Sequence, residues 1–326
     1  MPNWTADSPK NQWKSDDRGV KNITKSSAAK ARSFLGAMLL LFQVGRSPAA
    51  TKSKLDPARE VLVVVNLDDI GVHQDQTDAS FAAIGKGMAK TGTIMVPGPD
   101  FQRTAGLVKA NPDLHFGIHI TLTNEWQEKL PWPPLLTKQE VPSLYNEKGL
   151  MWPDQNLLAQ HADAREAEKE MEKQIRVALA SGIKLDHMDA HMGCYYLRPD
   201  LSDIAVRLAK KYRLAVVFPF PDLPESFRTV LQKNGLRCPD AFSGFYWIEG
   251  EGSDPSLALK TYENYLAGLG PGLHHLYIHT AYVTPETRRI MFDVAIRDRD
   301  FKIWTGEEIG DFAAKWGIKF ISYSDL

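Results

Sequence analysis

From about residue 55 the chain alternates short apolar runs with longer segments of helical periodicity. Runs such as VLVVV have the pattern of strands buried on both faces, and LHFGIHITL alternates apolar and polar residues along one strand. We expect strands at 61–67, 93–96, 114–122, 183–188, 214–218, 273–279 and 318–323. We expect helices at 78–90, 101–110, 163–180, 201–212, 257–269, 284–296 and 307–316. Repeated strand–helix units predict a parallel sheet covered by helices.

The number of expected strands decides between two α/β architectures. Seven or eight strands fit a distorted (β/α) barrel better than an open doubly wound sheet. A glycine-rich phosphate fingerprint follows none of the expected strands, which disfavours a nucleotide-binding fold. We therefore expect a single barrel domain over residues 56–326.

Residues 1–55 lack this alternation and are expected to form a disordered leader. They are basic and contain one apolar run, FLGAMLLLFQV at 34–44, which is too short to span a bilayer. Lys30 and Arg32 before the run, and small residues after it, are typical of a secretory signal peptide. The pattern predicts export to the periplasm or the extracellular space. The alternative is a disordered tail on a cytoplasmic protein.

A second interruption at about 124–162 is rich in tryptophan and proline, and includes Trp126, Trp132 and Trp152. These rings could form a platform for stacking sugars or a small additional core, and composition favours the core. The formal net charge of -1 argues against a general nucleic-acid binder. The two cysteines, Cys194 and Cys238, are too few for a zinc knuckle, and we expect free thiols.

Titratable residues gather where the expected strands end, which is the edge at which barrels of this class build active sites. The first strand ends in two adjacent aspartates, and histidines or an aspartate end three others. The residues are Asp68, Asp69, His119, His187, Asp189, His191, His275 and His279. The adjacent aspartates need the strand to turn into a loop, which Gly71 would permit.

One aspartate and two histidines are a common ligand set for Zn²⁺ or a related divalent ion. A second carboxylate could accept a proton from an activated water, and a further histidine could protonate a leaving group. Each residue also has an ordinary structural interpretation, since paired aspartates favour turns and a lone histidine often lies in a barrel interior. The spread of the set over four strand ends favours the metal site.

Several segments together resemble the YdjC-like family of carbohydrate deacetylases. They are VNLDDIG at 65–71, TGTIMVPGP at 91–99, NPDLHFGIHITLT at 111–123, GIKLDHMDAH at 182–191, LYIHTAY at 276–282 and GIKFISYSDL at 317–326. The resemblance covers 61–326 and implies a barrel related to the polysaccharide-deacetylase fold with one divalent metal ion, Mg²⁺ or Zn²⁺. It implies Asp69, His119 and His191 as ligands, Asp68 as general base and His279 as general acid.

Four further residues are expected to support these groups or to contact the substrate: Asp189, His187, His275 and Trp126. The resemblance implies a metal-dependent hydrolase that removes an N-acetyl group from an oligosaccharide or glycoconjugate. No G-x-S-x-G motif occurs in the expected domain, which disfavours serine chemistry. The alternatives are a catalytically weak or inactive glycan-binding barrel that keeps the metal, and a metal hydrolase acting on another amide or ester. We expect no stable membrane span, and the sequence does not indicate an oligomeric state.

Overall fold

The computed structural model describes residues 55–219, 225–245 and 254–326, all within the compact unit Ser53–Leu326. The expected signal segment at 34–44 lies outside the described residues. Within the described ranges, no helix is both long enough and apolar enough to cross a membrane.

Among the described residues, eight strands form one sheet in which every pairing is parallel, and seven of them follow the order β5-β4-β3-β2-β1-β7-β6. The last strand, β8, pairs with the first half of β1, while β2 pairs with the second half. The strands are β1 (Val61–Ile70), β2 (Thr91–Ile94), β3 (Phe116–Ile120), β4 (Leu185–Ala190), β5 (Ala215–Val216), β6 (Ala241–Gly244), β7 (Gly272–Ile278) and β8 (Lys319–Ile321).

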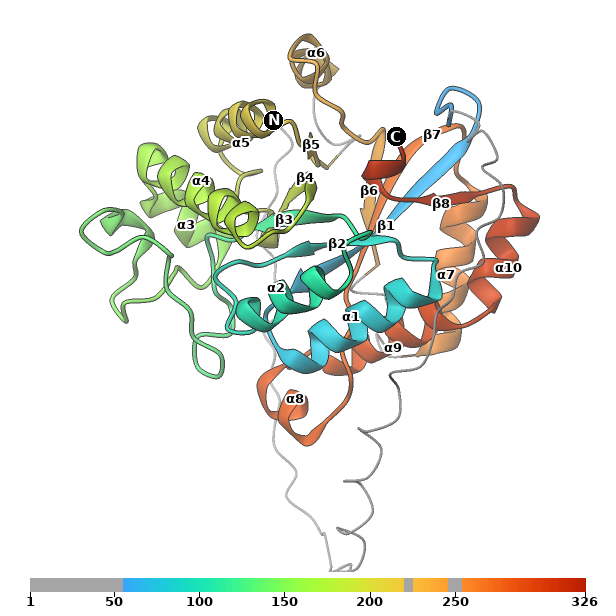
Figure 1. Cartoon of the computed structure of the whole chain (residues 1–326), viewed down its shortest axis with the longest axis horizontal. Coiled ribbons are helices and arrows are strands. Elements are labelled where there is room, and N and C mark those ends of the chain that lie inside the picture. Colours follow the sequence, from blue (N-terminus) through green and yellow to red (C-terminus); the bar gives the residue numbers. More distant parts are fainter. Residues whose placement is uncertain (1–54, 220–224, 246–253) are drawn as a thin grey trace, which may run out of the picture. The chain divides into compact units, whose positions relative to one another are not determined.

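The sheet curls but does not close among the described residues, because no ladder joins β5 to β6 (Figure 1). A hydrogen bond of 2.9 Å, from Val216 N of β5 to the carbonyl oxygen of Arg237, which precedes β6, crosses the opening. The expected α/β fold, a distorted barrel of seven or eight strands, is confirmed.

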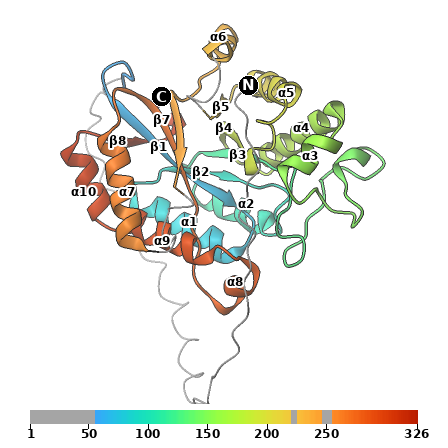
Figure 2. The same cartoon turned by 180° about the vertical axis from the view of Figure 1, so that it is seen from behind.

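The described part of the chain contains ten helices; most of them flank the curled sheet, whereas α6 and α8 lie away from it (Figures 1 and 2). They are α1 (Gln74–Lys86), α2 (Phe101–Ala110), α3 (Gln155–His161), α4 (Ala164–Ala180), α5 (Pro199–Tyr212), α6 (Glu225–Lys233), α7 (Pro255–Ala267), α8 (Pro285–Ile290), α9 (Val294–Thr305) and α10 (Glu308–Lys315). Short 3-10 turns are η1 (Pro142–Leu144), η2 (His191–Gly193) and η3 (Tyr323–Asp325).

The expected helix at 284–296 is wrong in its second half: α8 ends at Ile290, the backbone is extended at Met291, and α9 begins at Val294 and runs to Thr305, beyond the expected end. Three elements, α3, α6 and β6, were not predicted. The four residues of β6, AFSG, lack the apolar run that marks the other strands, and pairing with β7 defines this strand instead.

Alternate side chains of β1 point to opposite faces of the sheet and so divide the core in two. Val63, Val65 and Leu67 pack in the large core beneath the helices. Leu62 and Val64 pack inside the curled sheet, in a smaller cluster with Leu273, Ile321 and Tyr323. Asn66 and Asp68 continue this second series and therefore point into the concave interior.

A bulge near the end of β1 brings the two aspartates together. Leu67 pairs with Gly92 and Ile70 with Ile94, so two residues of β1 oppose one residue of β2. The two residues are Asp68 and Asp69, which lie opposite Thr93. Asp69 has a φ of 64°, in the left-handed region, which aspartate tolerates better than most residues. The prediction that this strand ends at Leu67 is therefore wrong, since β1 continues to Ile70. A bulge, rather than the expected loop, turns Asp69 toward the face of Asp68.

The close approach of β2 to β1 gives a testable effect on stability. A Cβ added at Gly92 would lie 2.5 Å from the carbonyl oxygen of Leu67, so the backbone would have to move. We expect Gly92→Ala to lower the free energy of unfolding by about 1–3 kcal/mol, measured by chemical denaturation. The control is Gly85→Ala in α1, where no atom lies within 4 Å of an added Cβ and alanine should be neutral or stabilising. Equal stability of the two variants would contradict this packing.

Candidate metal centre

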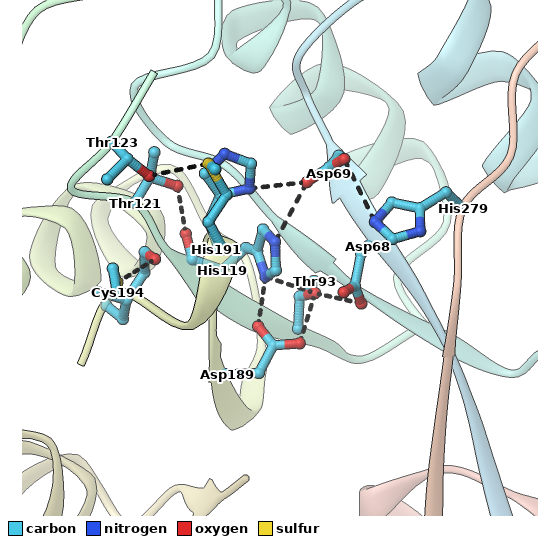
Figure 3. Close-up of polar contacts among 12 residues, drawn as sticks. Asp68, Asp69, Thr93, His119, Thr121, Thr123, Asp189, His191, Cys194 and His279 are labelled. Carbon is cyan, nitrogen blue, oxygen red and sulfur yellow. Dashed lines mark hydrogen bonds and ion pairs between the residues drawn. The ribbon is translucent and has the colours of Figure 1, made fainter. Parts of the chain in front are cut away.

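Three buried side chains converge where β1, β3 and β4 end (Figure 3). Asp69 comes from the bulge of β1, His119 from β3, and His191 from the first position after β4. One oxygen of Asp69, Oδ1, lies 3.2 Å from His119 Nε2 and 3.1 Å from His191 Nδ1. The structure thus brings together the three side chains that the resemblance implied as ligands.

These donors suit a small divalent ion in both chemistry and spacing. Ligands bound at about 2.1 Å and separated by about 90–110° lie roughly 3.0–3.4 Å apart, the range in which both measured separations fall. One carboxylate and two imidazoles are a ligand set used for Zn²⁺ and for other divalent ions. A second group, Asp68, His119 and Asp189, also places its donor atoms close enough to hold an ion.

Each histidine of the cluster has a carboxylate on its far ring nitrogen. His119 Nδ1 lies 2.6 Å from Asp189 Oδ1, and His191 Nε2 lies 2.9 Å from Glu125 Oε2. Burial disfavours the charged form of His191, but Glu125 and Asp69 outweigh burial and raise the pKa of His191 to about 9. The cluster is thus surrounded by negative charge, which favours a cation.

The second oxygen of Asp69 contacts two basic side chains. Arg297 Nη2 lies 2.9 Å from Asp69 Oδ2, and His279 Nε2 lies 3.6 Å from it. Arg297 is itself held by Asp293 at 2.8 Å and by the ring of Trp126, 5.1 Å from its guanidinium carbon. Burial opposes ionisation of Asp69, yet Arg297 and the histidines hold the pKa of this carboxyl well below its usual range. Asp69 is therefore an anion in the absence of metal.

Asp68 lies beside the cluster and is anchored from two sides. Its Oδ1 accepts a 2.6 Å hydrogen bond from Asn66 Nδ2, and its carbonyl oxygen accepts one of 2.8 Å from Gln76 Nε2. The same Asn66 amide donates to Asp189 Oδ2 at 3.2 Å. Burial, together with the Asp189 carboxylate, raises the pKa of Asp68 well above its usual range. Asp68 and Asp69 are neighbours in sequence, but their acidities are shifted in opposite directions.

His279 follows β7 and faces Asp69 on the side away from the two clustered histidines (Figure 3). Burial lowers the pKa of His279 to about 3, although Asp69 favours the protonated form. The imidazole is consequently neutral at neutral pH.

His187 and His275 lie deeper in the barrel interior. His187 Nε2 lies 3.0 Å from Asn66 Oδ1, and His187 Nδ1 lies 2.6 Å from Asp186 Oδ1. His275 Nδ1 lies 2.9 Å from the hydroxyl of Tyr323. His187 thus reaches Asp68 only through Asn66, and His275 packs with aromatic rings rather than with the metal-site cluster.

The tryptophans of 124–162 form core. Trp126 and Trp132 are buried in a satellite cluster with residues of the α8–α9 region, and their rings are edge-on at 5.9 Å. The predicted small core is therefore confirmed. Trp126 is buried beside His191 of the candidate metal site and is not exposed for stacking on a sugar. Trp152 is partly buried and stacks on His161, with the ring centres 4.1 Å apart.

Both cysteines, Cys194 and Cys238, are free thiols, as expected.

Sequence reasoning missed four residues that contact the site: Asn66, Thr93, Glu125 and Arg297. Asn66 and Thr93 lie in segments that were recognised, and strand alternation from Asp68 would have indicated Asn66. Glu125 directly precedes Trp126 in the irregular segment, and Arg297 lies in α9. Neither position carries a local pattern that points to the strand ends.

Fold and site together define an α/β barrel protein with a candidate metal centre at the carboxyl ends of its strands. Residues 62–315 match the family model described as YdjC-like protein. Curated relatives include a carbohydrate deacetylase of Thermus thermophilus, 34% identical over 74% of this chain and 84% of its own length. Another is carbohydrate deacetylase 1 of Listeria innocua, 24% identical over 81% of this chain and 99% of its own length. The chain belongs to the YdjC-like family.

A solved structure agrees with this fold. The protein EF3048 of Enterococcus faecalis V583 superposes with a TM-score of 0.70 at 22% identity, over 82% of this chain and 99% of its own. The resemblance inferred from the sequence motifs is therefore confirmed at the level of family and fold.

Proposed function

We propose that this protein is a hydrolase that removes an N-acetyl group from an amino-sugar-containing carbohydrate, with one divalent metal ion at Asp69, His119 and His191. Relatives in the same family are named carbohydrate deacetylases, which supports the reaction class. The observation that carries the mechanism is the convergence of Asp69 Oδ1, His119 Nε2 and His191 Nδ1, with a second carboxylate beside them.

The ion, when bound, would supply a Lewis acid that makes water nucleophilic at neutral pH and polarises the acyl carbonyl. Asp68 would accept the proton of the attacking water. Its anchoring by Asn66 and its raised pKa support this role, because a general base works best when its pKa lies near the working pH.

His279 would donate the proton that the departing amine needs. Its place on the opposite side of Asp69 from the clustered histidines supports this role. Since burial leaves its imidazole neutral, His279 has to gain a proton during turnover before it can act as an acid.

The test is acetate release from a panel of N-acetylated sugars, including chitin oligomers, peptidoglycan fragments and N-acetyl glycolipids. Exhaustive chelation should lower the rate by more than about 100-fold, because a catalytic ion contributes several kcal/mol to the transition state. Adding back Zn²⁺ or Mg²⁺ should restore it and identify the ion. Full activity after chelation would refute the metal-dependent mechanism. Tight glycan binding with metal present and no acetate released would favour the glycan-binding alternative.

A further inference from the structure

The two histidines of the cluster present different ring nitrogens to Asp69. His119 uses Nε2 and His191 uses Nδ1. A ligating imidazole is neutral and carries one N–H, which must be on the nitrogen that does not bind the ion. His119 therefore needs its proton on Nδ1, and His191 needs its proton on Nε2. Opposite tautomers are required at two adjacent ligands.

A carboxylate stands at each of the two nitrogens that must carry the proton. Asp189 faces His119 Nδ1 at 2.6 Å, and Glu125 faces His191 Nε2 at 2.9 Å. A carboxylate accepts but cannot donate when ionised, so each one selects the tautomer that leaves the other nitrogen free. Asp189 lies on β4, two residues before His191, whereas Glu125 comes from the irregular segment between β3 and η1.

The backbone on both sides of Glu125 is fixed by buried hydrogen bonds. Asn124 Oδ1 accepts from Trp126 N at 2.9 Å, and Asn124 N donates to Trp152 O at 2.8 Å. The rings of Trp126 and Trp132 lie 6.5 Å and 6.4 Å from the ring of His191. The tryptophan-rich segment therefore lies beside His191, and its hydrogen bonds fix the backbone from which the Glu125 side chain extends.

We infer that Glu125 is a positioning residue that fixes His191 as an Nδ1 ligand, and that the tryptophan-rich segment serves the metal centre through it. The inference deepens the proposed function and rests on its metal site. Removing the carboxylate frees His191 to rotate or to place its proton on Nδ1. Loss of such a group typically weakens metal binding by about 10–100-fold.

The experiment compares Glu125→Leu and Glu125→Gln with a matched control, Glu128→Gln, in the full chain. Glu128 belongs to the same segment, but its side chain is exposed and pairs with Lys148. Each protein is stripped of metal and titrated with Zn²⁺ against a competing chelator, and Co²⁺ absorption spectra report the geometry of the ligands. We expect the Zn²⁺ dissociation constant of Glu125→Leu to rise by about 10–100-fold. Glu125→Gln should show a smaller rise, because its amide oxygen can still accept the N–H, and Glu128→Gln should match the parent.

A purely structural Glu125 would lower the melting temperature of the metal-free protein without changing the Zn²⁺ dissociation constant or the Co²⁺ spectrum. That result in Glu125→Leu would overturn the inference and leave the proposed deacetylase intact. If Glu125→Leu does not fold, Glu125→Ala, which also lacks an acceptor for the His191 N–H, decides by the same two readouts. A parent protein that binds neither Zn²⁺ nor Co²⁺ would instead refute the metal site of the proposed function, and this inference with it.

Discussion

Asp69→Asn is expected to lose bound metal and activity together. The substitution keeps a residue that tolerates the left-handed backbone of the bulge, where φ is 64°. It removes the negative charge that both clustered histidines and Arg297 face. With the anionic ligand gone and Arg297 still present, the site would bind a cation much more weakly. Metal content should fall from near stoichiometric to background, and acetate release by about 10³-fold or more, since several kcal/mol of metal catalysis are lost.

Elemental analysis of the purified variants checks the first half of this prediction, and acetate release the second. Asp78→Asn is the matched control, because Asp78 is an exposed aspartate that pairs with Arg103 on the surface. His119→Ala and His191→Ala should lose metal as Asp69→Asn does. Retention of metal by all three variants would refute the ligand assignment.

Asp68→Asn is expected to separate catalysis from metal binding. Asp68 is not one of the three donors around Asp69 Oδ1, so the metal content should stay near that of the parent. The asparagine oxygen can still accept the hydrogen bond from Asn66, but the amide cannot take up a proton from water. Loss of a general base typically lowers kcat by about 10²–10⁴-fold, and we expect an effect of this size.

Metal content and steady-state kinetics of Asp68→Asn, measured beside Asp78→Asn, distinguish three outcomes. Lower kcat with metal retained supports the base. Unchanged kcat removes Asp68 from the mechanism. Loss of metal from Asp68→Asn while Asp69→Asn keeps it would show that the ion occupies the second donor group, Asp68, His119 and Asp189.

The strand ends could be predicted because apolar periodicity is visible in the local sequence, and parallel barrels place their active sites at the carboxyl ends of the strands. The run from Val61 to Leu67 indicates a buried strand, and the aspartates that follow must then lie at its carboxyl edge. The bulge was harder to predict from the sequence. It arises because Ile70 pairs with Ile94, and that pairing depends on the register between β1 and β2. The sequence indicated that both carboxylates must share a face, but not how.

Arg297 and Glu125 escaped prediction for a different reason. Their roles come from contacts between segments far apart in the chain, such as Arg297 with Asp69 and Glu125 with His191. The apolar periodicity of a helix does not show which of its arginines will reach a distant strand end. An irregular segment has no periodicity from which a contact could be predicted. Only the folded arrangement distinguishes these two residues from ordinary charged ones.

The pairing of β1 also has a consequence for how the protein folds. This strand carries both aspartates, yet it pairs along its length with β7 and, at Leu62–Val64, with β8 near the last residue of the sequence. Contacts of such long sequence separation form slowly, because a large loop must close before they stabilise the chain. The first half of β1 therefore has no strand partner, among the described strands, until β7 and β8 have been synthesised. We expect this half of β1 to pair late in refolding, after the strands β1 to β4 have come together.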